Sequence, residues 1–457
     1  MGLFKKREMT LEKKPNKVAY SPYDNPYVEE LSNHYKNRLL NEMNLDQLTK
    51  LGQQEMRDAI ERIVTQFMRE ERVVISQRDK EHLLTRIIDE SVGFGPLEPL
   101  LADEEITEIL INGHGEVYIE KKGQLRLTKV KFRDERHVRH IVDRVVAPLG
   151  RRIDESSPMV DARLPDGSRV NAVIPPISLN GTLVSIRKFR KDPYTMSDLI
   201  DFKSINQDMS KFLQGVVSAK SNVLISGGTG SGKTTLLNAL ARSIPPNERV
   251  ITVEDSAELK LDRPNVVGLE ARPPNTEDKG AITIRDLVRN ALRMRPDRIV
   301  VGEVRGAEAF DMLQAMNTGH EGSLTTVHAN SPLDAIRRLE GMIMMAGMEL
   351  PSSIIREYIV GALDFIIQIV RLQDGQRKMM SISEVVIDNK GGKVMLKEIF
   401  KFSRTGLSLD GKVLGDFTAT GIQPTSLQRL KVFGQDMPES MFKAKEGVNP
   451  DDSISYI

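Results

Sequence analysis

Residues 227–234 have the types and the spacing of a loop that binds phosphate groups. Gly227 is followed, after four residues, by Gly232, Lys233 and Thr234. Phosphate oxygens are held well by backbone N–H groups from a loop with positive φ angles, which glycine allows. Lys233 would reach between the β- and γ-phosphates, and the Thr234 hydroxyl would join the shell of a Mg²⁺ ion. The expected ligands are ATP and Mg²⁺, with Thr234 as the metal ligand. The predicted binding residues are Gly227, Gly228, Thr229, Gly230, Ser231, Gly232, Lys233, Thr234 and Thr235.

The residues on either side of this loop predict the elements that would hold it in place. An apolar run at 223–225 precedes the loop, and a helix with Leu236, Leu237 and Leu240 on one face follows it. Strand, loop and helix therefore occur in the order that phosphate binding needs, and the helix adds the positive end of its dipole. The alternative is a glycine-rich turn that merely packs a helix on a strand, which this context makes much rarer.

Three carboxylates follow the next predicted strand, at 249–253. Glu254, Asp255 and Glu258 would lie at the carboxyl end of that strand, where α/β sheets bind their ligands. We expect them to take part in catalysis and to order waters around Mg²⁺. The alternative is an acidic turn that caps the strand, and these residues alone do not decide between the two.

A third apolar strand, at 298–303, ends in Glu303. The aspartate that usually holds Mg²⁺ just before such a residue is absent, because this position is Gly302. We therefore expect Glu303 to polarise the attacking water, with the metal held through Thr234 and ordered waters.

His320 and His328 flank a further predicted strand, at 324–327. Two histidines eight residues apart in a chain without cysteine do not make a zinc pattern. A lone buried histidine is usually an ordinary core residue. In this setting His328 is predicted to sense the γ-phosphate, and His320 is predicted to contribute to nucleotide binding.

The chain divides into four predicted segments. Residues 1–25 are rich in lysine and predict a mobile basic tail, either a solvated leader or a weak contact with anionic lipid. Residues 26–92 show helical spacing of apolar residues and predict a small helical bundle. Residues 93–200 begin with glycine and proline and alternate like short strands around one helix, which predicts a mixed α/β domain. Residues 201–457 alternate strands and helices as a parallel sheet does, and then show hairpin signals at Asp374-Gly375 and at 389–392. They end in an extension with glycine-rich turns and one short helix.

Composition narrows the classes of function. Lys plus Arg number 65 and Asp plus Glu 64, and aromatic residues make up 5%, so no nucleic-acid binding is expected. The absence of cysteine excludes disulfides, thiolate zinc sites and cysteine nucleophiles. The longest apolar stretch, 358–372, carries Asp364, Gln368 and Arg371, and is expected to be a buried strand and its approach rather than a membrane span. No signal peptide is visible, so a cytoplasmic location is expected.

The motifs together resemble the secretion and type IV pilus ATPase superfamily. Residues 251–259 correspond to its acidic box, Glu303 to its catalytic carboxylate after an atypical Walker B motif, and 318–331 to its histidine box. The likeness covers roughly 80–402. It implies a RecA-like P-loop NTPase domain preceded by the mixed α/β domain and the helical bundle.

The resemblance also implies that the amino-terminal domain contributes arginines to the phosphates. The matching positions are Arg163, Arg169 and Arg187, with a surface strand arginine as the alternative for any one of them. It further implies that ATP binds between the two domains, and residues 189–204 are the predicted hinge. Other candidate arginines, at a subunit interface, are Arg293, Arg295 and Arg305.

Two departures favour one branch of the superfamily. The chain lacks the four-cysteine zinc insert of type II secretion and main pilus extension enzymes, and about 90 residues precede the α/β domain, unlike in conjugation-type relatives. It is most similar to the CpaF-type ATPases of tight-adherence (Tad/Flp) pili. This implies a homo-hexamer that assembles pilin through inner-membrane platform proteins and associates peripherally with the cytoplasmic membrane through them. Whether the motor also retracts the pilus is not decided by the resemblance. The alternatives are a conjugation-type secretion ATPase or a DNA translocase of the same P-loop class. A small-molecule kinase and a nucleotide-gated scaffold are the rivals from other classes.

Overall fold

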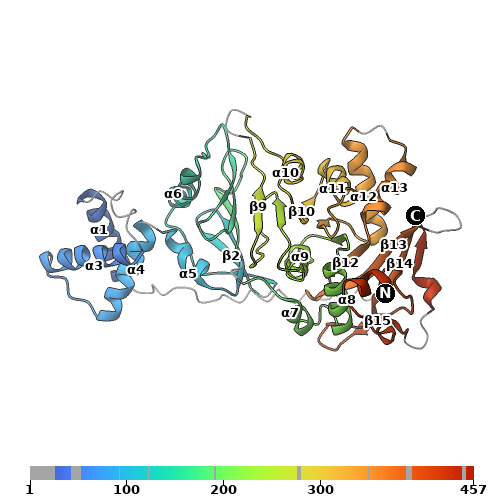
Figure 1. Ribbon diagram of the computed structural model, residues 1–457. Coiled ribbons are helices and arrows are strands. Elements are labelled where there is room, and N and C mark those ends of the chain that lie inside the picture. Colours follow the sequence, from blue (N-terminus) through green and yellow to red (C-terminus); the bar gives the residue numbers. More distant parts are fainter. Residues whose placement is uncertain are drawn as a thin grey trace, which may run out of the picture. The chain divides into compact units, whose positions relative to one another are not determined.

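The computed structural model describes residues 26–42, 53–91, 93–121, 123–189, 192–274, 279–347, 350–387, 394–444 and 449–456. The predicted basic tail lies outside these residues, as does a hairpin signal at 389–392. The chain forms two compact units, Met1–Arg190 and Lys191–Ile457 (Figure 1). The sequence placed the corresponding boundary at 200/201.

The first unit begins with amphipathic helices that pack on one another. Helices α1 (Pro26–Glu42), α3 (Gln53–Glu70) and α4 (Gln77–Ser91) share a core of their own. Apolar residues recur every three or four positions, as in Ile60, Val64 and Phe67, so each helix buries one face.

The rest of the first unit is a six-stranded antiparallel sheet with one helix on it. The strand order is β3-β2-β1-β6-β5-β4. Helix α6 (Glu135–Val146) covers one face and buries Val138, Ile141 and Val142 against it (Figure 1). The strands alternate buried and exposed residues, so the other face carries polar side chains. The elements are η1 (Gly95–Leu97), α5 (Glu98–Ala102), β1 (Ile106–Asn112), β2 (Glu116–Lys121), β3 (Gln124–Leu127), η2 (Ala147–Leu149), β4 (Met159–Arg163), β5 (Arg169–Val173) and β6 (Leu183–Arg187).

The second unit is built on a ten-stranded mixed sheet in the described residues. Its order is β15-β14-β13-β12-β7-β11-β10-β8-β9, with β16 beside β14. The strands from β12 to β9 run parallel, and β13, β14 and β15 continue the sheet antiparallel. They are β7 (Val223–Gly227), β8 (Val250–Glu254), β9 (Val266–Glu270), β10 (Arg298–Val304), β11 (Leu324–Val327), β12 (Phe365–Arg371), β13 (Arg377–Ile387), β14 (Val394–Leu407), β15 (Val413–Ala419) and β16 (Ile454–Tyr456).

Helices cover both faces of this sheet. One core contains residues of α7, α8 and α9, and the other contains residues of α10 to α13 (Figure 1). All five residues of β7 are buried, as expected for a parallel strand with helices on both sides. The helices are α7 (Met196–Asp201), α8 (Gln207–Ser218), α9 (Lys233–Ala241), α10 (Ile284–Ala291), α11 (Glu308–Asn317), α12 (Pro332–Met345), α13 (Ser352–Ala362) and α14 (Leu427–Val432), with the short turns η3 (Glu439–Phe442) and η4 (Pro450–Ser453).

The carboxyl-terminal stretch contains more regular structure than the sequence suggested. The expected short helix is present as α14, but β14 runs to Leu407 and β15 pairs with it as a further strand. Leu430 and Phe442 pack into the core beneath the sheet, so this stretch is part of the second unit. The polar residues and glycines of 403–415 hid the strand, because hairpin strands with one exposed face lack an apolar run.

The predicted fold class is confirmed: an α/β P-loop unit of the RecA-like kind follows a mixed α/β domain and a helical bundle. The apolar stretch 358–372 is the end of α13 followed by β12, so the approach to the buried strand is helical. Among the described residues, every helix is too short or too polar to cross a lipid bilayer.

Candidate nucleotide-binding site

The phosphate-binding loop joins the carboxyl end of β7 to the start of α9. Gly230 and Gly232 have φ angles of 67° and 97°, which side chains other than glycine rarely adopt. A Cβ atom on Gly227 would lie 2.4 Å from the carbonyl oxygen of Ile369, so the neighbouring strand β12 also requires glycine there. Helix α9 begins at Lys233. The predicted sequence of strand, loop and helix is confirmed.

Lys233, Glu303 and His328 converge beside this loop. Lys233 Nζ lies 3.2 Å from His328 Nε2 and 4.0 Å from Glu303 Oε1, and it donates to the Gly228 carbonyl at 3.2 Å. His328 Nε2 lies 3.0 Å from Glu303 Oε1. The three residues come from the carboxyl ends of β7, β10 and β11, which are neighbours in the sheet. Parallel strands therefore bring together groups that are up to 95 residues apart in sequence.

One carboxylate oxygen of Glu303 can still accept a hydrogen bond. Glu303 Oε1 is buried and has no hydrogen-bond partner among the described residues, because the imidazole of His328 is close but poorly aligned. Glu303 Oε2 accepts two hydrogen bonds from Arg305, from Nε at 2.9 Å and from a terminal nitrogen at 2.7 Å. Burial lowers the pKa of His328, which favours the neutral imidazole. A carboxylate held on one side and open on the other can accept a proton from water.

Glu254 closes a turn behind Glu303. Its carboxylate is buried and accepts hydrogen bonds from the backbone N–H groups of Glu258 and Leu259 at 2.7 and 2.9 Å. Burial raises its pKa to about 7. A Cβ on Gly302 would lie 3.1 Å from Glu254 Cγ, which explains the glycine that precedes Glu303. These contacts fit the alternative interpretation of Glu254 as a carboxylate that caps a turn.

The other two acidic residues lie on the loop that this turn forms. Asp255 is exposed, and its carboxylate is 3.7 Å from Arg305. The Glu258 carbonyl accepts a hydrogen bond from Asn238 of α9 at 3.2 Å, which ties the loop to the helix after the phosphate loop. Arg305, which the sequence left unranked, is therefore the residue that links Glu303 to Asp255.

Two arginines that sequence analysis did not select also lie over the phosphate loop. Arg377 Nε donates to the Gly230 carbonyl at 3.0 Å, and Arg371 lies 3.5 Å from the position of a Cβ on Gly230. They come from β12 and β13 at either side of a hairpin turn. The Asp374-Gly375 turn was visible in the sequence, but the pairing of β12 with β7 was not.

His320 lies at the other edge of the sheet. It precedes β11, whereas His328 follows it, and four strand residues span about 13 Å. The His320 carbonyl accepts a hydrogen bond from Ser323 at 2.8 Å, within the turn that enters the strand. The structure therefore does not bring His320 to the phosphate loop. Arg293 and Arg295 precede β10 and so lie at this same edge.

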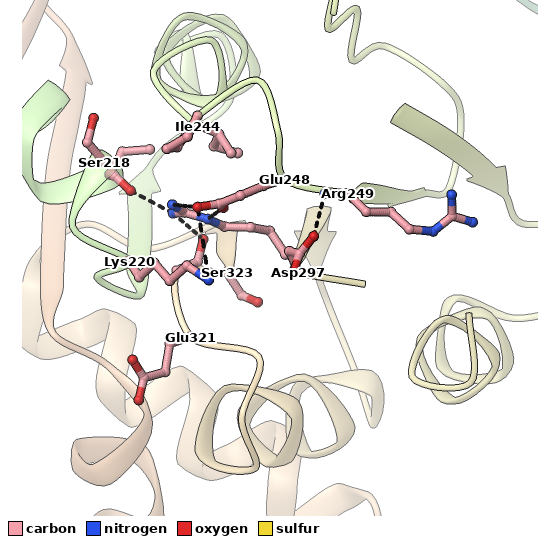
Figure 2. A network of polar contacts seen from close by, with 12 residues as sticks. Ser218, Lys220, Ile244, Glu248, Arg249, Asp297, Glu321 and Ser323 are labelled. Atoms are coloured by element: carbon pink, nitrogen blue, oxygen red, sulfur yellow. Dashed lines mark hydrogen bonds and ion pairs between the residues drawn. The ribbon is translucent and has the colours of Figure 1, made fainter. Parts of the chain in front are cut away.

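A buried ion pair fixes this amino edge. Arg298 is fully buried, and it donates to Glu248 from Nε at 2.5 Å and to the carbonyls of Val217 and Gly322 at 2.6 and 3.2 Å. Figure 2 shows Glu248 within this network, with Lys220 and Ser323 beside it. The network holds the turn that contains His320.

The three predicted arginines of the first unit lie side by side. Arg163 pairs with Arg169 across β4 and β5, and Arg169 pairs with Arg187 across β5 and β6. Residues directly opposite in antiparallel strands point to the same face, so the sheet concentrates three positive charges in one row. Glu108 of β1 is opposite Arg187.

The loop residues fit a nucleotide with Mg²⁺. A Cβ on Gly228 would meet no atom within 4 Å, so the loop is open where its backbone would face phosphate oxygens. Thr234 is in the first turn of α9, next to Lys233, as a ligand to phosphate-bound Mg²⁺ requires. The donor set therefore matches a Mg²⁺-nucleotide.

A parallel sheet with this loop and these side chains at its carboxyl edge defines a P-loop nucleotide-binding protein. The chain belongs to the type II/IV secretion system protein family, whose model matches residues 90–405. This match confirms the predicted superfamily. It does not distinguish the CpaF-type branch from the other branches.

Several known proteins are similar to the chain. A putative conjugal transfer protein of Mycobacterium tuberculosis is 38% identical over 333 residues, covering 72% of this chain and 93% of that protein. The type IV secretion system protein VirB11 of Brucella suis is 35% identical over 322 residues, covering 64% and 88%. The crystal structure of the Brucella suis VirB11 ATPase with sulphate aligns at 31% identity, covers 63% of this chain and 94% of that chain, and has a TM-score of 0.35.

Proposed function

We propose that this protein is an ATPase that drives a membrane-bound secretion or pilus machine. The observation that carries the proposal is the convergence of Lys233, Glu303 and His328 at the carboxyl edge of three adjacent parallel strands. A loop that only bound nucleotide would not need, beside its lysine, a buried carboxylate oxygen that makes no hydrogen bond within the described residues.

Each side chain has a distinct role in this proposal. Lys233 and the loop N–H groups hold the phosphates, and Glu303 Oε1 takes a proton from the attacking water. Arg305 fixes the other oxygen of Glu303, and His328 lies against Oε1 and the Lys233 ammonium from the side of β11. Mg²⁺, held through Thr234, would neutralise charge on the phosphate oxygens.

The arginine row of the first unit is proposed to supply further positive charge. Three arginines in register place positive charges side by side, and such a row attracts an anion. Arg163, Arg169 and Arg187 would therefore favour the state in which the first unit meets the nucleotide phosphates. Such differential contact is what allows hydrolysis to shift a conformational balance.

We propose further that the protein works as a homo-hexamer with inner-membrane platform proteins, at the inner face of the cytoplasmic membrane. The finer proposal is assembly of a Tad/Flp-type pilus. The helical segment α1 to α4 ahead of the α/β domain and the absence of cysteine support it. Pilus formation by a strain that carries only Lys233→Ala protein would contradict this assignment.

A conjugation-type secretion ATPase is the second candidate. Two relatives, a putative conjugal transfer protein and VirB11 of a type IV secretion system, favour it. Loss of conjugative transfer with normal pili in a strain lacking the protein would select this candidate over the first.

The central test is phosphate release by purified protein with Lys233→Ala and Glu303→Gln variants. Lys233→Ala is expected to abolish turnover in a folded protein. Glu303→Gln is expected to bind a fluorescent ATP analogue as the unaltered protein does, and to hydrolyse ATP about 10³-fold more slowly. Undiminished turnover in either variant would refute the site, and loss of binding in Glu303→Gln would show that this carboxylate is structural.

A further inference from the structure

Gln368 is a buried polar residue in a strand whose other buried residues are apolar. It lies in the middle of β12, is 3% exposed, and pairs with Ser226 of β7 just before the phosphate loop. A glutamine amide is costly to bury unless its polar atoms are satisfied, and an apolar residue would suit this position better for stability alone.

The amide of Gln368 is bonded on one side only. Its nitrogen donates to the carbonyl of Ala329 at 3.3 Å, and the Ser226 hydroxyl donates to the same carbonyl at 3.5 Å. Gln368 Oε1 is buried and has no hydrogen-bond partner among the described residues. Strand β7 lies between β12 and β11 in the sheet. Gln368 therefore reaches across β7, just before the phosphate loop, to Ala329, the residue after His328.

The segment that carries His328 is fixed from both sides. Beyond Ala329, the Asn330 N–H donates to Asp334 at 2.9 Å, and the Asp334 N–H donates to Ser331 at 3.1 Å, where α12 begins. On the other side, Gln368 and Ser226 hold this segment at the Ala329 carbonyl. Its position sets the backbone from which His328 reaches Glu303 and Lys233.

A parallel contact holds Glu303. Thr326 of β11 donates its hydroxyl hydrogen to the Gly302 carbonyl at 2.8 Å. One buried side chain thus binds the carbonyl before Glu303, and another binds the carbonyl after His328. The first contact comes from the adjoining strand β11, and the second comes from β12, on the far side of β7.

We propose that Gln368 is a positioning residue, which acts through the Ala329 carbonyl to hold His328 against Glu303 during ATP hydrolysis. This inference rests on the proposed function, and it adds a residue that neither the motifs nor the family match singles out. Gln368 is buried in the sheet and bonds to Ala329, so we expect its effect to be on turnover rather than on nucleotide affinity.

The first test is a double-mutant cycle with the full chain. Gln368→Met keeps the volume and removes the hydrogen bond, and is expected to lower kcat about tenfold with KM for ATP within about twofold. In the His328→Ala background the same change is expected to have no further effect on kcat. Ile366→Val, a buried apolar change two residues away on β12, is the matched control and is expected to leave kcat unchanged. An unchanged kcat in Gln368→Met, or an equal loss in the His328→Ala background, would overturn the inference.

The second test needs no hydrolysis. The ¹³Cε1 resonance of His328 in histidine-labelled protein, assigned with His328→Ala, is expected to shift in Gln368→Met and not in Ile366→Val. An unmoved resonance would overturn the inference even if the protein is an active ATPase. A shifted resonance in a protein without ATPase activity would refute the proposed function and support the contact.

Discussion

The two edges of the parallel sheet in the second unit use buried charge in opposite ways. At the amino edge, Arg298 directs its donors to Glu248 and to two backbone carbonyls. At the carboxyl edge, one oxygen of Glu303 has no hydrogen-bond partner in the part of the chain that the structure describes, and Lys233 lies beside a histidine. A buried charged group whose hydrogen bonds are all made within the protein stabilises the fold. A buried charged group with an atom that can still accept a hydrogen bond is available to a ligand.

The two histidines illustrate the difference. His320 and His328 flank a single short strand, and their sequence contexts look alike. Only His328 follows the strand, and so only His328 reaches the phosphate loop. The direction of a strand in a parallel sheet, rather than the residue type, decides which histidine can meet a nucleotide.

The largest effect is expected at the amino edge, on stability. Arg298→Met would leave Glu248 buried without its cation, and is expected to lower the free energy of unfolding by about 3–5 kcal/mol in urea. The double variant Arg298→Met with Glu248→Leu removes both charges and is expected to recover much of that loss. If the single and double variants unfold alike, the pair does not hold this edge.

Glu254 tests whether the carboxyl edge also contains a purely structural carboxylate. Its pKa is raised from an ordinary value of 4.5 to about 7, because burial disfavours the charged form. The folded state therefore binds the proton more tightly, so this contribution to stability is complete below about pH 4.5 and is lost as pH rises through about 7.

Glu254→Gln, which stays neutral, is accordingly expected to gain stability relative to the unaltered protein as pH rises, by at most about 3 kcal/mol between pH 4.5 and 8. Urea unfolding at several pH values measures this. Asp255→Asn, an exposed change at the next residue, is the control for loss of a surface charge. A difference between Glu254→Gln and the unaltered protein that does not vary with pH would contradict the buried, protonated carboxyl.

The two histidines give the third prediction. His328→Ala is expected to lower kcat for ATP hydrolysis about 10²-fold, because it removes the side chain that lies between Glu303 and Lys233. His320→Ala is expected to leave kcat within about twofold, since its turn lies at the amino edge. A large loss in His320→Ala with a normal unfolding transition would contradict the separation of the two edges.

Much of the fold followed from the sequence, because its signals are local. The loop at 227–234 and its strand and helix follow from glycine, apolar and lysine positions, and parallel strands place Glu303 and His328 nearby. The contacts of Arg377 and Gln368 did not follow, because they depend on which strand lies beside β7. In the sequence, Gln368 was visible only as a polar residue in an apolar run. A polar residue in a predicted buried strand is the sequence signal that indicates such a contact.

The smallest effect is expected from Arg377, and it tests how rigid the carboxyl edge must be. Its hydrogen bond to the Gly230 carbonyl holds the outer part of the phosphate loop, but the side chain is exposed, so water can replace much of the contact. Arg377→Gln is therefore expected to raise KM for ATP about threefold and to change kcat less. Arg404→Gln, an exposed arginine on β14, controls for the lost charge. An equal rise in KM in both variants would mean that Arg377 acts through long-range charge alone, whereas a fall in kcat without a change in KM would mean that the loop position governs the chemical step.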